Sequence, residues 1–267
     1  MTHAWPDLES LTDIVRRAAH EELLPRFTRV AHAHKADGSI LTEADLAMDA
    51  RLHAELQLAW PAIGFLSEEM GAAEQQQLLA AANRPLWCLD PLDGTSNFAA
   101  GIPFFGVSLA LLYDEQVELG LIYDPIRDEC FTSRRGAGAW LNGQRLKTAA
   151  IDLPLKQCIA LIDFKRLTPA LCRRLAETPP YRSQRNFGSC ALEWAWLAAG
   201  RGHVYLHGGQ KLWDFAAGSR LFAEAGGTSF TLDGADVFVA RLETRSAVAS
   251  PDPALALTWL DWLRSPT

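Results

Sequence analysis

Two aspartates placed directly after an apolar run are the feature that most constrains this chain. The stretch WCLDPLDGTSNF occupies residues 87–98, and its acids are Asp90 and Asp93. Pro91 fixes its own φ and biases the residue before it toward extended geometry, so both carboxylates can point into one space beyond a strand. Two adjacent carboxylates repel each other unless a proton or a cation lies between them. The pattern predicts a site for a hard cation such as Mg²⁺, although the same residues are also ordinary turn formers.

The two residues that follow add parts of a phosphate site. Gly94 has no side chain, so backbone can approach a phosphate closely at that point. The N–H groups of Gly94 and Thr95 could donate to phosphate oxygens, especially if they begin a helix. The Thr95 hydroxyl could orient an attacking water. The stretch therefore predicts a combined metal and phosphate site.

Length and composition narrow the class of protein. The chain has 267 residues, 49% of them hydrophobic, which suits one large domain or two tightly joined lobes. A net charge of -7 disfavours general binding of nucleic acid or anionic membrane. The five cysteines form no CxxC pair, and neither a signal peptide nor an apolar run of about 18 residues is visible. We therefore expect a cytoplasmic protein with reduced thiols, no membrane partner and no nucleic-acid partner.

The hydrophobic patterns divide the chain into two parts. In the first part we expect helices over about 7–28 and 43–60, a loop or hairpin over 31–40, strands over 63–71 and 85–90, and an antiparallel hairpin over about 104–124. After about residue 150 we expect strands at QCIALID and HVYLH, and helices at TPALCRRLAE, 189–200, 213–227 and PALALTWLDWLR. We thus expect a single domain over 1–267, with an N-terminal α+β lobe over about 1–150 and a C-terminal α/β lobe over about 151–267.

Other acids stand at positions from which they could join the first two. Glu68 and Glu69 end the strand pattern before residue 70, and Asp214 opens a late helix directly after a tryptophan. Asp45 lies inside the second expected helix. Taken singly, paired acids at a strand end are commonly a solvated tip, and an aspartate at a helix start is commonly a cap.

Together these motifs resemble the inositol monophosphatase family of Mg²⁺-dependent, lithium-sensitive phosphatases. The matching segments are DPLDGTSNF (90–98), WDFAAG (213–218) with the later EAGG (224–227), SEEMG (67–71), KADGSILTEAD (35–45) and GAGAWLNG (136–143). Their order and spacing hold over nearly the whole chain, with Ser67 where the family usually has glycine. The resemblance implies an α+β protein with the sugar-phosphatase fold, a layered αβαβα sandwich with the metal site between lobes, and commonly a homodimer.

The resemblance also implies roles for single residues. One Mg²⁺ would be held by Glu68, Asp90 and the Leu92 carbonyl, a second by Asp90, Asp93 and Asp214, and a third, weaker ion by Glu68 and water. A slip of one residue would exchange Glu68 for Glu69. The catalytic set would be Glu68, Asp90 and Asp93 together with Asp45 and Thr95, the pair that orients the attacking water. The substrate would touch Gly94, Thr95, Ser189, Cys190, His207 and Asp214.

The implied reaction is direct hydrolysis of a small phosphate ester, without a phosphoenzyme. The substrate stays open, because His207 stands where relatives that handle inositol generally carry a glutamate. Substrates similar to inositol 1-phosphate, histidinol phosphate, fructose 1,6-bisphosphate and phosphoadenosine phosphate are all compatible with the motifs. Glu193, Lys211 and Arg185 could also reach the site, although surface positions explain the two basic residues better. A different class of function is a non-catalytic protein that keeps this fold and binds a partner.

Overall fold

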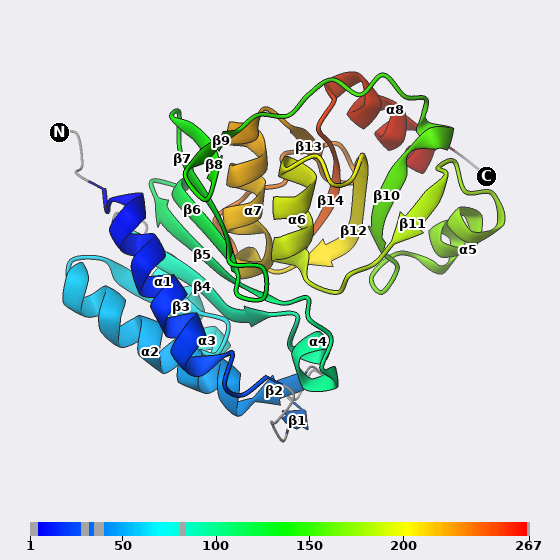
Figure 1. Ribbon diagram of the computed structural model, residues 1–267. Coiled ribbons are helices and arrows are strands. Elements are labelled where there is room, and N and C mark those ends of the chain that lie inside the picture. The colour runs from blue at the N-terminus through cyan, green and yellow to red at the C-terminus, as the bar shows by residue number, and fades with distance from the viewer. Residues whose placement is uncertain (1–4, 28–31, 35–39, 81–83, 266–267) are drawn as a thin grey trace.

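Five layers, alternately helical and stranded, make up the computed structural model of the chain (Figure 1). The structure describes residues 5–27, 32–34, 40–80 and 84–265. Helices α1 (Leu8–Glu22) and α2 (Glu43–Ala59) cover the outer face of a first sheet. Helices α6 (Cys190–Ala198) and α7 (Leu212–Ala225) lie between this sheet and a second one, whose outer face is covered by α5 (Pro169–Glu177) and α8 (Pro253–Arg264). The expected αβαβα arrangement is confirmed.

The first sheet has seven strands in chain order. They are β3 (Gly64–Ser67), β4 (Leu86–Asp93), β5 (Gly106–Tyr113), β6 (Gln116–Asp124), β7 (Glu129–Arg134), β8 (Gly138–Leu141) and β9 (Gln144–Leu146). Only β3 and β4 are parallel, and α3 (Ala72–Ala80) forms part of their crossover. The expected hairpin over about 104–124 is confirmed as β5 and β6. Between β4 and β5 lies a short helix, α4 (Thr95–Ala100), which directly follows the paired aspartates.

The second sheet has five strands in the order β11-β10-β12-β14-β13. Their bounds are β10 (Ile159–Asp163), β11 (Ser183–Arg185), β12 (Val204–Gln210), β13 (Thr228–Phe230) and β14 (Arg245–Ser250), and a 3-10 turn, η1 (Leu155–Gln157), comes before them. Strand β10 is parallel to both β11 and β12, so the carboxyl ends of these three strands meet at one edge. The expected division into two lobes near residue 150 stays a prediction.

The core follows the two-residue period of the strands. In β4, Cys88 packs toward the middle helical layer, whereas Trp87 and Leu89 pack toward α1 and α2. In β10, Leu161 faces the middle layer and its neighbours Ala160 and Ile162 face α5 and α8. Both sheets therefore bury side chains on both faces, which explains why their strand sequences read as nearly continuous apolar runs.

The middle layer depends on a close approach between its two helices. A Cβ atom added at Gly218 of α7 would lie 2.6 Å from Cβ of Trp194 on α6, a separation that packed carbon atoms do not reach. Trp194 is fully buried, and its Nε1 donates to Gln210 Oε1 at 3.1 Å. The absence of a side chain at residue 218 thus sets how near α7 lies to α6.

The N-terminal part consists of one shortened helix and a small hairpin. Helix α1 ends at Glu22, earlier than the expected 28, because Pro25 cannot continue a helix. The polar segment after it contains β1 (His32–His34) and β2 (Ile40–Thr42), which pair antiparallel as a hairpin; residues 35–39 of the matched segment 35–45 lie outside the described residues.

Among the helices that the structure describes, none has the length and apolarity needed to cross a bilayer.

Candidate metal centre and active site

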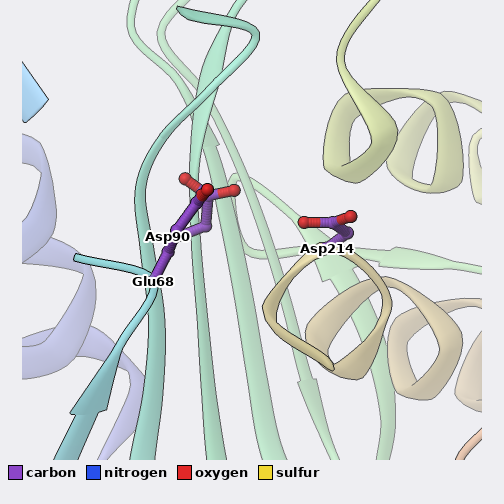
Figure 2. Close-up of side chains that lie close together, drawn as sticks. All are labelled: Glu68, Asp90 and Asp214. Atoms are coloured by element: carbon purple, nitrogen blue, oxygen red, sulfur yellow. The ribbon is translucent and has the colours of Figure 1, made fainter. Parts of the chain in front are cut away.

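Three carboxylates from distant parts of the chain meet at one end of the first sheet. Glu68 directly follows β3, Asp90 lies in β4, and Asp214 lies in the first turn of α7. One oxygen from each lies within 4.8 Å of the others, a set that we call the acidic cluster (Figure 2). The acid that joins the cluster is Glu68 and not its neighbour Glu69. Oxygen atoms at this spacing are the ligands that a hard divalent cation requires.

Strand β4 is irregular where it carries its acids. In a regular strand, residues three apart point to opposite faces of the sheet. Here the register between β4 and β5 shifts between Asp90 and Asp93, and the Leu92 N–H donates to Asp90 Oδ1 at 3.0 Å. The shift, at a proline that cannot take part in a regular ladder, lets both carboxylates act on the same space.

The electrostatics of the cluster favour a bound cation. Burial, reinforced by the charges of Glu68, Asp93 and Asp214, raises the pKa of Asp90 well above its usual range. Burial and the charges of Asp93 and Glu68 raise the pKa of Asp214 to about 8. Carboxylates in this state must share protons or receive a cation, and the all-oxygen donor set fits Mg²⁺ better than a softer metal.

Asp93 lies close to the cluster but is not one of its three members. Its Oδ2 accepts hydrogen bonds from Ser189 Oγ and from the Ala191 N–H, both at 2.6 Å. Burial raises the pKa of Asp93 to about 6, although these two bonds favour its ionised form. Asp93 therefore connects β4 to the start of α6.

Asp45 and Thr95 form a hydrogen-bonded pair. Thr95 Oγ1 lies 3.0 Å from Asp45 Oδ1 and 2.9 Å from the Leu92 carbonyl oxygen, so its single proton can serve either acceptor. Asp45 is held in place by the first turn of α2, where the Thr42 N–H and Oγ1 donate to Asp45 Oδ2 at 2.7 and 2.6 Å. This capping box fixes the carboxylate that the threonine hydroxyl meets.

Gly94 occupies a conformation that other residues rarely adopt. Its φ is 92°, and a Cβ there would lie 3.1 Å from the Phe104 carbonyl oxygen and 3.3 Å from Phe105 Cα. The glycine lets the chain turn from β4 into α4 at a point where neighbouring backbone leaves little room for a side chain.

We expect Gly94→Ala to destabilise the fold by about 1–3 kcal/mol, because an L side chain is strained at this φ. Urea unfolding of the variant beside Gly136→Ala measures the effect. Gly136 also has a positive φ, of 70°, but an added Cβ there meets nothing within 4 Å. Equal losses in the two variants would show that the contacts around residue 94 add nothing to the backbone strain.

The residues expected to touch the alcohol part of the substrate lie beyond Asp93. Ser189 precedes α6 and donates to Asp93, whereas Cys190 begins α6. Burial and nearby acids raise the pKa of the Cys190 thiol well above its usual range, which does not suit a nucleophile. His207 lies in β12 next to Asp163 at the end of β10, with 3.5 Å between His207 Nε2 and Asp163 Oδ2.

From the sequence, Glu193 and Lys211 were expected only as residues that could reach the site, and Asp163 was not expected there at all. Glu193 is 1% exposed and accepts from the Phe187 N–H at 2.7 Å; burial raises its pKa to about 8. Lys211 is not simply a surface charge, because its Nζ lies 3.8 Å from Glu68 Oε1 and 5.4 Å from the centre of the Trp213 ring. Asp163 was missed, although an acid that ends the apolar run QCIALID is the same signal that singled out Asp90.

The family follows from a direct comparison. The model of the inositol monophosphatase family matches residues 7–260. The chain belongs to the inositol monophosphatase family. The recognition from the motifs is therefore confirmed.

Some of the proteins similar to this chain are named inositol monophosphatases, and others are named Nus factor SuhB. An inositol-1-monophosphatase of Mesorhizobium japonicum is 37% identical over 204 residues, which cover 75% of each chain. Inositol monophosphatase 1 of Solanum lycopersicum is 32% identical over 94% of this chain and 90% of its own length. The Nus factor SuhB of Xylella fastidiosa is 34% identical over 82% of this chain and 80% of its own length.

Solved structures confirm the sugar-phosphatase fold of the family. The extragenic suppressor protein suhB from Bartonella henselae superposes with a TM-score of 0.81 at 28% identity, over 97% of this chain and 100% of that chain. A structure described as IMPase/NADP phosphatase complexed with Mg²⁺ and phosphate superposes with a TM-score of 0.78 at 22% identity, over 97% of this chain and 92% of that chain. At that identity the second likeness establishes the fold alone.

Proposed function

We propose that this chain is a Mg²⁺-dependent phosphomonoesterase that hydrolyses a small phosphorylated alcohol or sugar similar to inositol 1-phosphate. The observation that carries the proposal is the buried acidic cluster, in which oxygens of Glu68, Asp90 and Asp214 lie within 4.8 Å of one another. Membership of a family whose relatives are named inositol monophosphatases supports it. A protein of the same fold solved with Mg²⁺ and phosphate adds to this support.

In this proposal the acids hold the metal and the backbone holds the ester. Glu68, Asp90 and the Leu92 carbonyl would bind one Mg²⁺, and Asp90, Asp93 and Asp214 a second. Bound Mg²⁺ would supply Lewis acidity and lower the pKa of a coordinated water. The N–H groups at 94 and 95 would then donate to phosphate oxygens, since they begin α4.

The pair Asp45 and Thr95 would orient the attacking water. The Thr95 hydroxyl can donate to Asp45 and accept a hydrogen bond from water at the same time. The fixed carboxylate would thus orient the hydroxyl, and the hydroxyl would orient the water. We therefore expect Thr95→Ala to lower kcat by about 10²-fold or more, as is usual for the loss of a proton-handling group. Thr95→Ser keeps the hydroxyl and is the matched control. Equal kcat values for the alanine and serine variants, measured by phosphate release, would remove the hydroxyl from the mechanism.

A panel of esters tests the proposed activity. We expect phosphate release from at least one of inositol 1-phosphate, histidinol phosphate, fructose 1,6-bisphosphate, phosphoadenosine phosphate and glycerol 2-phosphate. The release should require Mg²⁺, stop with EDTA and fall with Li⁺. Hydrolysis that persists after exhaustive chelation would contradict the metal-dependent proposal, and the ester hydrolysed with the highest kcat/KM would identify the substrate.

The relatives named Nus factor SuhB favour a second candidate of another class, a protein that acts by binding a partner. If the protein hydrolysed none of the esters in the panel, this partner-binding function would be favoured. Binding to labelled RNA and DNA would test whether the expected lack of nucleic-acid binding holds. A homodimer and a cytoplasmic location stay proposals, and the mass of the protein in solution tests the first of these.

A further inference from the structure

Both ring nitrogens of His207 are already engaged. Nδ1 accepts a hydrogen bond from the Gly209 N–H at 3.1 Å, so Nδ1 carries no proton in this arrangement. The proton of the neutral ring is therefore on Nε2, which faces Asp163 Oδ2 at 3.5 Å. The side chain of His207 is 6% exposed. His207 thus has little capacity to bond a substrate directly.

Asp163 has the capacity that His207 lacks. Its side chain is 18% exposed, three times the exposure of the His207 side chain. Oδ1 accepts from the Lys165 N–H at 2.6 Å and Oδ2 faces His207, but each carboxylate oxygen can accept more than one hydrogen bond. Burial by itself would raise the pKa of Asp163, yet the hydrogen bonds from His207 and from the Lys165 N–H lower it, so the side chain is a ready acceptor.

The position of Asp163 suits contact with the alcohol part of a substrate. Asp163 is the last residue of β10 and the register partner of His207 in the parallel strand β12. The carboxyl end of a strand in a sheet of this kind lies at the edge where ligands bind. Cys190 begins α6, and its thiol lies near enough to feel the charges of four acids: Asp214, Asp93, Glu193 and Asp163. Asp214 of the acidic cluster and Asp163 thus both lie near Cys190, so a substrate whose phosphate is bound at the cluster would have its alcohol part within reach of Asp163.

We propose that Asp163, held by His207, accepts hydrogen bonds from hydroxyl groups of the substrate and so selects a polyol monophosphate. The inference rests on the proposed phosphatase function. A carboxylate attracts hydroxyl donors and repels a second phosphate, so it favours a polyhydroxylated leaving group over a bisphosphate. Asp163 is the residue that sets specificity, and His207 is a positioning residue that acts through it.

The test compares two esters that differ only in hydroxyl groups. We expect Asp163→Ala to raise KM for inositol 1-phosphate by about 10- to 100-fold, the usual effect of losing a charged hydrogen-bond partner. KM for cyclohexyl phosphate, which lacks the hydroxyls, should change by less than about twofold, since uniform binding of the phosphate is retained. His207→Ala should raise KM for inositol 1-phosphate alone, and the double variant should be no worse than Asp163→Ala, as expected of residues that act as a unit.

Lys165→Ala is the matched control, because it removes an exposed neighbouring side chain and keeps the N–H that bonds Asp163. Asp163→Asn keeps the shape of the side chain if the alanine variant does not fold. Equal losses on the two esters, or a gain in kcat/KM for inositol 1-phosphate, would overturn the role of Asp163 while leaving the phosphatase intact. Hydrolysis of neither ester by the wild-type chain, with hydrolysis of fructose 1,6-bisphosphate, would overturn this inference alone; hydrolysis of no ester would overturn the proposed function as well.

Discussion

Asp90→Asn should abolish turnover while making the metal-free protein more stable. Asp90 is 3% exposed at the centre of the acidic cluster, and the charges of Glu68, Asp93 and Asp214 all bear on it. An amide removes one negative charge and weakens cation binding, so we expect kcat to fall by about 10³-fold or more. The same change relieves repulsion among buried acids, so the unfolding temperature without Mg²⁺ should rise.

Two measurements check this prediction. Phosphate release gives kcat, and thermal unfolding with and without Mg²⁺ gives the stability difference. Asp114→Asn is the matched control, because it makes the same chemical change at an exposed residue on the β5–β6 turn. A variant at Asp90 that Mg²⁺ stabilises as strongly as it stabilises the wild-type protein would show that the cluster is not where the cation binds.

As pH rises, the stability of the metal-free protein should fall and the stabilisation by Mg²⁺ should grow. The pKa of Asp214 is raised from 3.8 to about 8, and that of Asp93 from 3.8 to about 6. Between the ordinary and raised values the folded protein holds protons that the unfolded chain has released, so stability falls as pH rises through this window. His203 opposes this trend, because burial lowers its pKa and so adds stability as pH rises through its ordinary value.

The effect of Mg²⁺ separates the contribution of the acidic cluster to the pH dependence of stability from that of His203. Mg²⁺ must displace the protons that the acids hold at low pH, so its binding strengthens as pH rises. We expect Mg²⁺ to raise the unfolding temperature by about 10 °C at pH 8.5 and far less at pH 5.5, since several kcal/mol are involved in a chain of this size. Differential scanning calorimetry at the two pH values measures this. The same increment at both would mean that the cation does not compete with these protons.

The fold and the acidic cluster could be predicted to different depths from the sequence. The apolar runs of β4, β5, β10 and β12 come from local chemistry, so the strands could be placed from residue patterns alone. The meeting of Asp90 with Asp214 has no local signal, because it depends on how α7 packs between two sheets. Only the resemblance of both motifs to one family made that meeting predictable.

The remaining site residues depend on contacts that no short pattern contains. The exclusion of Asp93 from the cluster follows from its bonds to Ser189 and Ala191, which are set by the position of α6. The approach of Lys211 to Glu68 likewise brings the start of α7 to the end of β3 in the first sheet. The engagement of His207 follows from the irregularity of β12 between residues 207 and 210, where the backbone N–H of Gly209 turns toward the ring.

The close contact of Gly218 with Trp194 links helix packing to the chemistry at the start of α7. Asp214 and Gly218 are four residues apart, so they lie on the same side of the helix, one turn from each other. A methyl group at 218 would push α7 off Trp194 and carry Asp214 with it, and Mg²⁺ demands nearly ideal octahedral geometry of its ligands. The spacing of the three carboxylates thus depends on the absence of a Cβ atom at Gly218. Selection for cation affinity would therefore act on Gly218, a residue that never touches the ion.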